Sequence, residues 1–185
     1  MALLPDEWSR RLGFFSLEDE RLRAVLPQLR GRLLDIGAGT NRLVRLYGNG
    51  VGIDVHDFGG GAIIVSDTRR LPFEDGCFDT VSFVACLNHI PYRQEALFEA
   101  KRILRPGGRA VLTMIGPIIG TVGHRIWWYS EDKQRTVDEG ELMGMSPQSV
   151  LCLLDKAGFT TRLHSRFLYG LNHLFVAQKG QRAQL

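Results

Sequence analysis

Short apolar runs alternate with amphipathic segments along this chain of 185 residues. Five runs are bounded by glycine or polar turns, which is typical of buried strands in a parallel sheet. They lie at 32–39, 50–55, 62–65, 78–90 and 109–115. Two further strand-like runs, 160–170 and 171–179, are joined by a tight turn at Gly170. The pattern therefore predicts seven strands.

Between these runs, apolar residues recur at the three- and four-residue spacing of helices. The segments with this spacing are 16–30, 41–48, 93–108 and 146–159. Ser16 and Ser146 are the expected N-caps, and Pro147 occupies a first helical position, where a missing N–H is tolerated. The expected helix ends are Gly31 (with Pro27 disturbing the last turn), Gly48, Pro106-Gly107-Gly108 and Gly158.

Strands that alternate with helices form right-handed βαβ units, which put helices on both faces of a mainly parallel sheet. We therefore predict an α/β fold of the Rossmann-like, doubly wound type. Its seven-stranded sheet is mainly parallel, with an antiparallel last strand and helices on both faces. The length suits a single domain, 1–185, in which 1–30 is an N-terminal helical segment.

One segment breaks the alternation of strands and helices. Residues 116–145 separate the fifth strand from the next helix and contain Trp127, Trp128 and Tyr129. Because the carboxyl end of the fifth strand faces the cleft of such a sheet, we predict that this insert is a partial lid. Its aromatic rings would line a substrate pocket. The alternative is that the rings only fill core.

Composition is that of a globular protein, with 44% hydrophobic and 23% charged residues. No run reaches the ~18 apolar residues of a spanning helix, and the start MALLPDEWSRR does not resemble a secretory signal. The three cysteines form neither a zinc spacing nor a disulfide framework. The net charge of +3 is spread along the chain. We expect a cytoplasmic protein with no metal site and no nucleic-acid partner, and the oligomeric state stays open.

The stretch LLDIGAGTNRLVRLYGNGVGID, from Leu33 to Asp54, indicates a ligand site. Gly37 and Gly39 follow one strand and let backbone N–H groups approach a ligand closely. Asp54 ends the next strand, where a carboxylate can accept hydrogen bonds from both hydroxyls of a ribose. A dinucleotide loop reads G-x-G-x-x-G, and here Arg42 stands in place of the third glycine, which disfavours NAD.

Four segments resemble the successive motifs of class I S-adenosylmethionine (SAM)-dependent methyltransferases. They are LLDIGAGT, GID, SDTRRLPFEDGCFDTV and ILRPGGRAVLT. The sequence is most similar to the small-molecule group called the type 11 methyltransferase family, over about Leu33 to Met114. The resemblance implies methyl transfer from SAM, leaving S-adenosylhomocysteine (SAH), to an O, N or C atom of a small-molecule or lipid-like acceptor.

The resemblance also assigns cofactor contacts to matching positions. Asp35 would orient the glycine loop or meet the ammonium of SAM through water, and Asp54 would bind the ribose. Asp67 would accept from the adenine amino group. The other implied contacts are Gly37, Ala38 and Gly39 at the methionine and ribose, Val55 and Thr68 beside the adenine, and Ala85 and Cys86 at the methionine end. Asn41 replaces a glycine of many family members and should be tolerated.

His89 follows the fourth strand and is the candidate catalytic residue, since it could take a proton from an acceptor nucleophile. Asp79 begins that strand at the opposite edge and is expected to be structural. Three alternatives to a small-molecule methyltransferase remain: an RNA or protein methyltransferase, a non-catalytic module that binds SAM and, because of Gly39, an NAD enzyme. RNA binding would weaken with salt, and a non-catalytic module would leave the SAM methyl group untouched.

Overall fold

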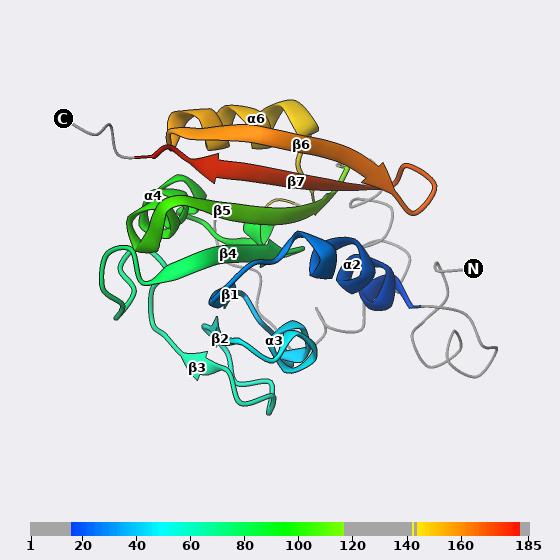
Figure 1. Cartoon of the computed structure of the whole chain (residues 1–185). Coiled ribbons are helices and arrows are strands. Elements are labelled where there is room, and N and C mark those ends of the chain that lie inside the picture. Colours follow the sequence, from blue (N-terminus) through cyan, green and yellow to red (C-terminus); the bar gives the residue numbers. More distant parts are fainter. Residues whose placement is uncertain (1–15, 117–141, 143, 182–185) are drawn as a thin grey trace.

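The computed structural model of the chain describes residues 16–116, 142 and 144–181. Within this part of the chain the strands form one seven-stranded sheet with the order β3-β2-β1-β4-β5-β7-β6. The strands are β1 (Leu33–Ile36), β2 (Gly50–Asp54), β3 (Ile63–Ile64), β4 (Phe78–Val84), β5 (Leu104–Ile115), β6 (Phe159–Phe167) and β7 (Asn172–Lys179). β7 runs antiparallel to both β5 and β6, and the other paired strands of the described residues are parallel (Figure 1). The predicted fold class is confirmed.

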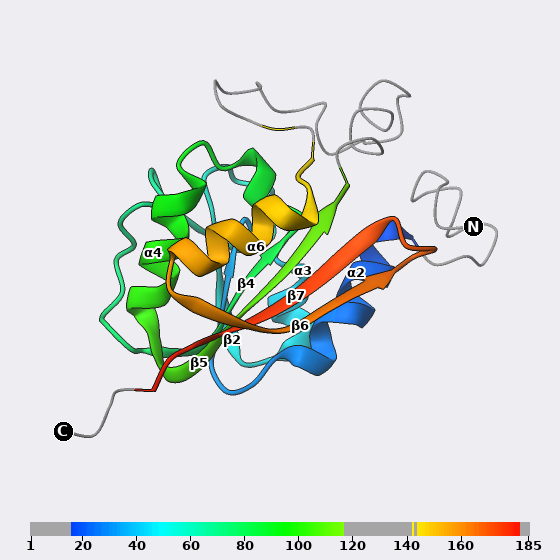
Figure 2. The ribbon, with the colours of Figure 1, turned by 90° about the horizontal axis from the view of Figure 1, so that it is seen from above.

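Helices cover both faces of the sheet (Figure 2). On one face lie α4 (Arg93–Ile103) and α6 (Pro147–Lys156), and on the other lie α2 (Leu17–Val25) and α3 (Arg42–Tyr47). Each pair buries its own apolar cluster against the sheet: Leu97 and Leu154 belong to the first, Leu22 and Leu43 to the second. No helix in the described segments is long and apolar enough to cross a membrane.

The starts of α2 and α6 are set by the serines that the sequence indicates. Ser16 caps α2 by accepting from the Asp19 N–H, while the Asp19 carboxylate accepts from the Ser16 N–H in return. A 3-10 turn at Leu26–Gln28 follows, with Pro27 inside it. Ser146 caps α6 through the Ser149 N–H. These local hydrogen bonds satisfy backbone donors that helix starts leave unpaired.

Arg42 explains why the third glycine of a dinucleotide loop is missing. It is the first residue of α3, and its guanidinium donates to Glu18 at 2.6 Å and to Asp19 at 2.5 Å. Both carboxylates lie in the first turn of α2. The Arg42 side chain therefore joins α2 to α3 beside the glycine loop. In a dinucleotide-binding loop this position is glycine, because the helix there packs closely against the strand.

Three element boundaries differ most from the prediction. The strand expected at 78–90 ends at Val84 and is followed by the 3-10 turn Leu87–His89. The strand expected at 62–65 is reduced to Ile63–Ile64, because β3 is an edge strand that pairs only with the end of β2. The helix expected to stop at Pro106-Gly107-Gly108 ends at Ile103, and β5 already begins at Leu104. Leu104 pairs with Phe78, but the next pair is Arg109 with Thr80. The proline and glycines thus form an irregularity inside the strand, since the backbone before proline disfavours helix.

Glu99 on α4 fixes the long loop between β3 and β4. Its carboxylate is 7% exposed and accepts from the Leu71 N–H at 2.7 Å and from the Arg102 guanidinium at 2.6 and 2.8 Å. Arg102 also donates to the Phe73 carbonyl. The loop that carries Asp67 toward the cleft is therefore anchored to α4 by charged hydrogen bonds.

We expect Glu99→Gln to destabilise the fold by about 2–3 kcal/mol, because it removes a buried charge partner of Arg102. Burial raises the pKa of the Glu99 carboxyl, but the hydrogen bonds from Arg102 and Leu71 outweigh this and lower its pKa overall. The stabilisation is present above the ordinary pKa of glutamate and is lost as the pH falls through the lowered value. Urea unfolding at pH 7 and at lower pH measures it.

Glu95→Gln is the matched control, since Glu95 is exposed on the same helix. It should leave the free energy of unfolding nearly unchanged. Equal stability of the Glu99→Gln and Glu95→Gln proteins at pH 7 would show that the Glu99 ion pair contributes nothing to the fold.

Candidate cofactor and acceptor site

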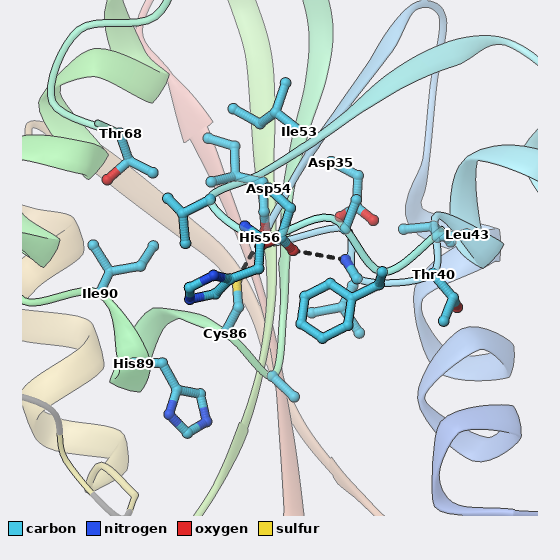
Figure 3. A pocket seen from close by; sticks show the side chains of 18 of the residues that line it. Asp35, Thr40, Leu43, Ile53, Asp54, His56, Thr68, Cys86, His89 and Ile90 are labelled. Atoms are coloured by element: carbon cyan, nitrogen blue, oxygen red, sulfur yellow. Dashed lines mark hydrogen bonds between the residues drawn. The ribbon is translucent and has the colours of Figure 1, made fainter. Parts of the chain in front are cut away.

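A cavity of about 450 Å³ opens beyond the carboxyl ends of β1, β2 and β4. This volume is within the range of about 300–1,000 Å³ for small-molecule sites. In Figure 3, Asp54 and His56 lie near the centre of the cavity. The lining includes Asp35, Gly37, Ala38, Gly39, Asp54, Val55, Asp67, Thr68, Ala85, Cys86 and His89. Every predicted cofactor position, and the predicted catalytic histidine, thus meets in one place.

The glycine loop has the backbone conformation that its sequence suggests. Gly37 and Gly39 have φ values of +71° and +50°, in the left-handed region that side chains disfavour. A Cβ on Gly37 would lie 2.6 Å from the Cβ of Cys86, whereas a Cβ on Gly39 would meet nothing within 4 Å. Gly37 therefore permits close packing against β4, and Gly39 leaves open space for a ligand.

Asn41 is tolerated at the position where many family members have glycine. Its φ is +58°, and asparagine adopts the left-handed conformation more readily than most residues. Gly52 lies opposite and makes room, since a Cβ there would fall 2.1 Å from the Asn41 Oδ1. The pair shows why the loop can carry a side chain at this point.

Asp54 is joined to the glycine loop. Its Oδ2 accepts from the Gly39 N–H at 2.8 Å, and its Oδ1 accepts from the His56 N–H at 3.1 Å. Each carboxylate oxygen can still accept a further hydrogen bond. Asp54 therefore both shapes the loop and offers acceptor oxygens to the cavity.

Asp35 is a buried carboxyl behind the glycine loop. The Ser82 hydroxyl donates to its Oδ1 at 2.6 Å. Burial raises the pKa of the Asp35 carboxyl to about 7; the Ser82 hydrogen bond opposes this rise, and the charge of Asp54 adds to it. Asp35 thus changes charge near neutral pH, which makes it sensitive to any cation placed in the cavity.

Asp67 and Arg69 form one rim of the cavity with Tyr92. The Asp67 carboxylate accepts from the Arg69 N–H and Nε, both at 2.8 Å, and the Arg69 guanidinium lies 4.2 Å from the centre of the Tyr92 ring. The hydrogen bonds to Arg69 hold the pKa of the Asp67 carboxyl below its usual value. Asp67 is therefore ionised and already engaged, with its remaining acceptor capacity at the rim.

The end of β4 closes the cavity floor. Ala85 has a φ of +55°, and its N–H donates to the Thr113 hydroxyl at 3.0 Å. The Cys86 thiol donates to the Ile36 carbonyl at 2.9 Å. Ala85 holds a conformation that is strained for a non-glycine residue, and these contacts tie it to β5 and β1.

Among the cavity residues that the sequence analysis did not assign to the site are two aromatic ones. His56 and Phe58 follow Asp54, line the cavity and meet edge to face, with ring centres 6.3 Å apart. The signal that could have indicated them is their position in DVHDF, within four residues of Asp54 at the end of β2. Asp79 lies away from the cavity, as predicted: it accepts from the Arg32 N–H and pairs with Arg105.

A family model described as a methyltransferase domain matches residues 34–112. The ubiquinone/menaquinone biosynthesis C-methyltransferase of Bordetella avium is 29% identical over 119 residues, which is 54% of this chain and 46% of that relative. A crystal structure of a SAM-dependent methyltransferase from Thermotoga maritima, described as a possible histamine N-methyltransferase, has a TM-score of 0.67 at 22% identity and covers 86% of this chain and 88% of that one. These comparisons support a class I SAM-dependent methyltransferase domain over residues 34–112.

The methyltransferase fold recurs in a structure from Burkholderia thailandensis. That protein is the 1,6-didemethyltoxoflavin N1-methyltransferase with bound 1,6-didemethyltoxoflavin and SAH, at a TM-score of 0.64 and 20% identity over 95% of this chain and 85% of that one. At this identity the likeness establishes the fold alone. The chain spans about half the length of the Bordetella C-methyltransferase that it matches.

The structure does not describe the predicted lid. Trp127, Trp128 and Tyr129 lie outside the described residues, as does most of the insert 116–145. From its end, Leu142 is described, and its N–H donates to the Asn88 carbonyl beside His89. The role of the aromatic cluster stays a prediction.

Proposed function

We propose that this methyltransferase binds SAM in the cavity and transfers its methyl group to a small-molecule acceptor. The observation that carries the proposal is the junction of the glycine loop with Asp54, where the carboxylate accepts from the Gly39 N–H. An acid joined to such a loop can receive ribose hydroxyls while the glycine leaves room for the rest of the ligand. SAM supplies a sulfonium methyl group that is open to in-line displacement.

The chain's own residues bind and orient under this proposal. Asp54 would hold the ribose, and Asp35 would face the amino-acid end. Val55, His56 and Phe58 would lie beside the adenine, with Asp67 and Thr68 at its rim. Ala85, Cys86 and His89 lie toward the end of β4, where the acceptor would meet the methyl group. The protein forms no covalent intermediate, and its contribution is alignment and exclusion of water.

The comparisons support a choice of acceptor class by analogy. The Bordetella relative is named for ubiquinone/menaquinone biosynthesis, and the Burkholderia structure holds 1,6-didemethyltoxoflavin. We infer an acceptor with a planar ring, methylated on an O, N or C atom. Incubation with methyl-labelled SAM and two probe acceptors, a demethylmenaquinol analogue and 1,6-didemethyltoxoflavin, tests this class.

We expect SAH and SAM to raise the melting temperature, while NAD and NADP leave it unchanged. A ligand at about 100 times its dissociation constant adds about 2.7 kcal/mol to the free energy of unfolding. Thermal-shift measurements with the four compounds check this. A shift with NAD and none with SAH would overturn the proposal.

The rival functions give different results in the same experiments. An RNA methyltransferase would transfer label to total RNA and bind it with an affinity that falls steeply with salt. A protein methyltransferase would transfer label to polypeptide substrates. A non-catalytic module would bind SAH and transfer label to no acceptor.

A further inference from the structure

Asn88 makes a compact set of hydrogen bonds next to the candidate catalytic histidine. It lies in the 3-10 turn Leu87–His89 that follows β4, and it is 4% exposed. Its backbone carbonyl accepts from the Leu142 N–H at 2.9 Å. Its side-chain Nδ2 lies 2.9 Å from the Leu142 carbonyl oxygen and 3.1 Å from the His89 Nε2. One amide nitrogen therefore faces two neighbours.

The Leu142 carbonyl fixes which way the Asn88 amide points. A carbonyl oxygen can only accept, so the atom facing it must be the amide nitrogen. With the amide reversed, the Asn88 Oδ1 would oppose the Leu142 oxygen, two acceptors with no proton between them. The orientation with Nδ2 toward Leu142 is therefore the one that satisfies a buried side chain.

The same orientation decides where His89 carries its proton. Nδ2 has no lone pair to accept with, so its contact with the His89 Nε2 requires Nε2 to be the acceptor. The imidazole is then neutral and carries its proton on Nδ1, because the hydrogen bond that one ring nitrogen makes determines which of the two nitrogens is protonated. A base at Nε2 would first have to break the bond from Asn88.

We propose that Asn88 is a positioning residue: it holds His89 neutral and protonated on Nδ1, so that His89 orients the methyl acceptor instead of removing a proton from it. The statement that His89 orients a methyl acceptor rests on the proposed function. The assignment of the His89 tautomer rests only on the contacts of Asn88. It replaces the hypothesis that His89 takes a proton from the acceptor nucleophile. The backbone and side-chain bonds to Leu142 keep the amide in this orientation.

The tautomer can be read directly by NMR of the full chain labelled with ¹⁵N-histidine. The spectrum of His89→Gln identifies the His89 signals among those of the five histidines. In the wild-type protein at pH 7.5, the inference requires a protonated Nδ1 and an unprotonated Nε2. A wild-type His89 with its proton on Nε2 overturns it, and no variant is needed for that result.

Two variants separate positioning from packing. Asn88→Ala removes the donor, and the His89 proton should move to Nε2, the nitrogen that free imidazole side chains prefer to protonate. Asn88→Asp keeps the shape but presents acceptor oxygens, so it should also draw a proton onto Nε2. A folded Asn88→Asp protein that keeps the wild-type tautomer would contradict the inference. The control is Asn49→Ala, since the Asn49 amide also donates to a backbone carbonyl, that of Gly31, but lies outside the cavity lining; it should leave the His89 signals unchanged.

Calorimetry with SAH keeps the two proposals apart. If SAH binds to neither wild type nor variants, the proposed function fails while the tautomer of the unliganded protein still decides the role of Asn88. If SAH binds equally to the wild type and to Asn88→Ala and the tautomer changes, the effect of Asn88 is confined to His89, as proposed. A loss of SAH binding in Asn88→Ala, with the His89 tautomer unchanged, would assign Asn88 to the cofactor site instead.

Discussion

Replacing Asp54 by alanine is expected to weaken SAH binding by roughly 30- to 150-fold, or about 2–3 kcal/mol, while the fold survives. The carboxylate receives the Gly39 and His56 N–H groups, and in the proposed complex it would also receive the ribose hydroxyls. The substitution therefore removes ligand contacts and loosens the loop that presents them. Isothermal calorimetry with SAH measures the loss, and circular dichroism checks the fold.

Asp57→Ala is the matched control for this experiment. The Asp57 Oδ1 accepts from the Gly59 N–H at 2.7 Å, so it is also a loop carboxylate that accepts from a backbone N–H. It is exposed and does not line the cavity. Asp57→Ala should bind SAH like the wild type. A folded Asp54→Ala protein with wild-type affinity would remove Asp54 from the cofactor site.

The sequence could predict the fold because its signals are local. A serine before a run of acids marks the start of α2, and Gly48 with a φ of +78° ends α3 where a left-handed residue is needed. The mainly parallel character of the sheet follows from alternation with helices and from right-handed crossovers. The sequence did not predict features that depend on strand pairing between distant segments. β3 is short because it lies at the sheet edge, and β5 begins early because Leu104 pairs with Phe78 of β4.

The sequence could predict which strand ends form the candidate site, but not the side-chain contacts and protonation states within it. Glycines and an acid at consecutive strand ends must meet at one edge of a parallel sheet, and Gly39 and Asp54 do so. The use of Arg42 to join α2 could not be foreseen, because its partners Glu18 and Asp19 come from an element placed only by tertiary packing. The state of Asp35 was equally hidden, since a pKa depends on burial and neighbours.

Asp35 is expected to make SAH binding depend on pH. In the unliganded protein its pKa is raised to about 7, against 3.8 for an ordinary aspartate, with burial as the largest cause. Between these two values the folded protein holds a proton that the unfolded chain has lost. The contribution of Asp35 to stability is therefore greatest at low pH, falls as the pH rises from about 4 to 7, and then levels off.

A ligand ammonium near Asp35 would favour the ionised carboxylate and lower its pKa. Below pH 7 the binding of SAH would then release a proton, so the affinity should rise with pH, by up to about tenfold per pH unit, and become flat above pH 7. Calorimetry from pH 5.5 to 8, in two buffers of different ionisation enthalpy, measures both the affinity and the protons released.

Asp35→Asn isolates this effect from any other source of pH dependence. The amide keeps the shape of the carboxyl and can still accept from the Ser82 hydroxyl. We expect the variant to be more stable than the wild type above pH 7 without ligand, to bind SAH more weakly there, and to lose most of the pH dependence. Ser82→Ala should shift the dependence of SAH affinity on pH instead of removing it. The substitution removes a hydrogen bond that lowers the pKa of Asp35, so the rise in affinity should move to higher pH. If wild type and Asp35→Asn show the same dependence of SAH affinity on pH, Asp35 does not face the charge of the ligand, and its role is confined to holding the glycine loop.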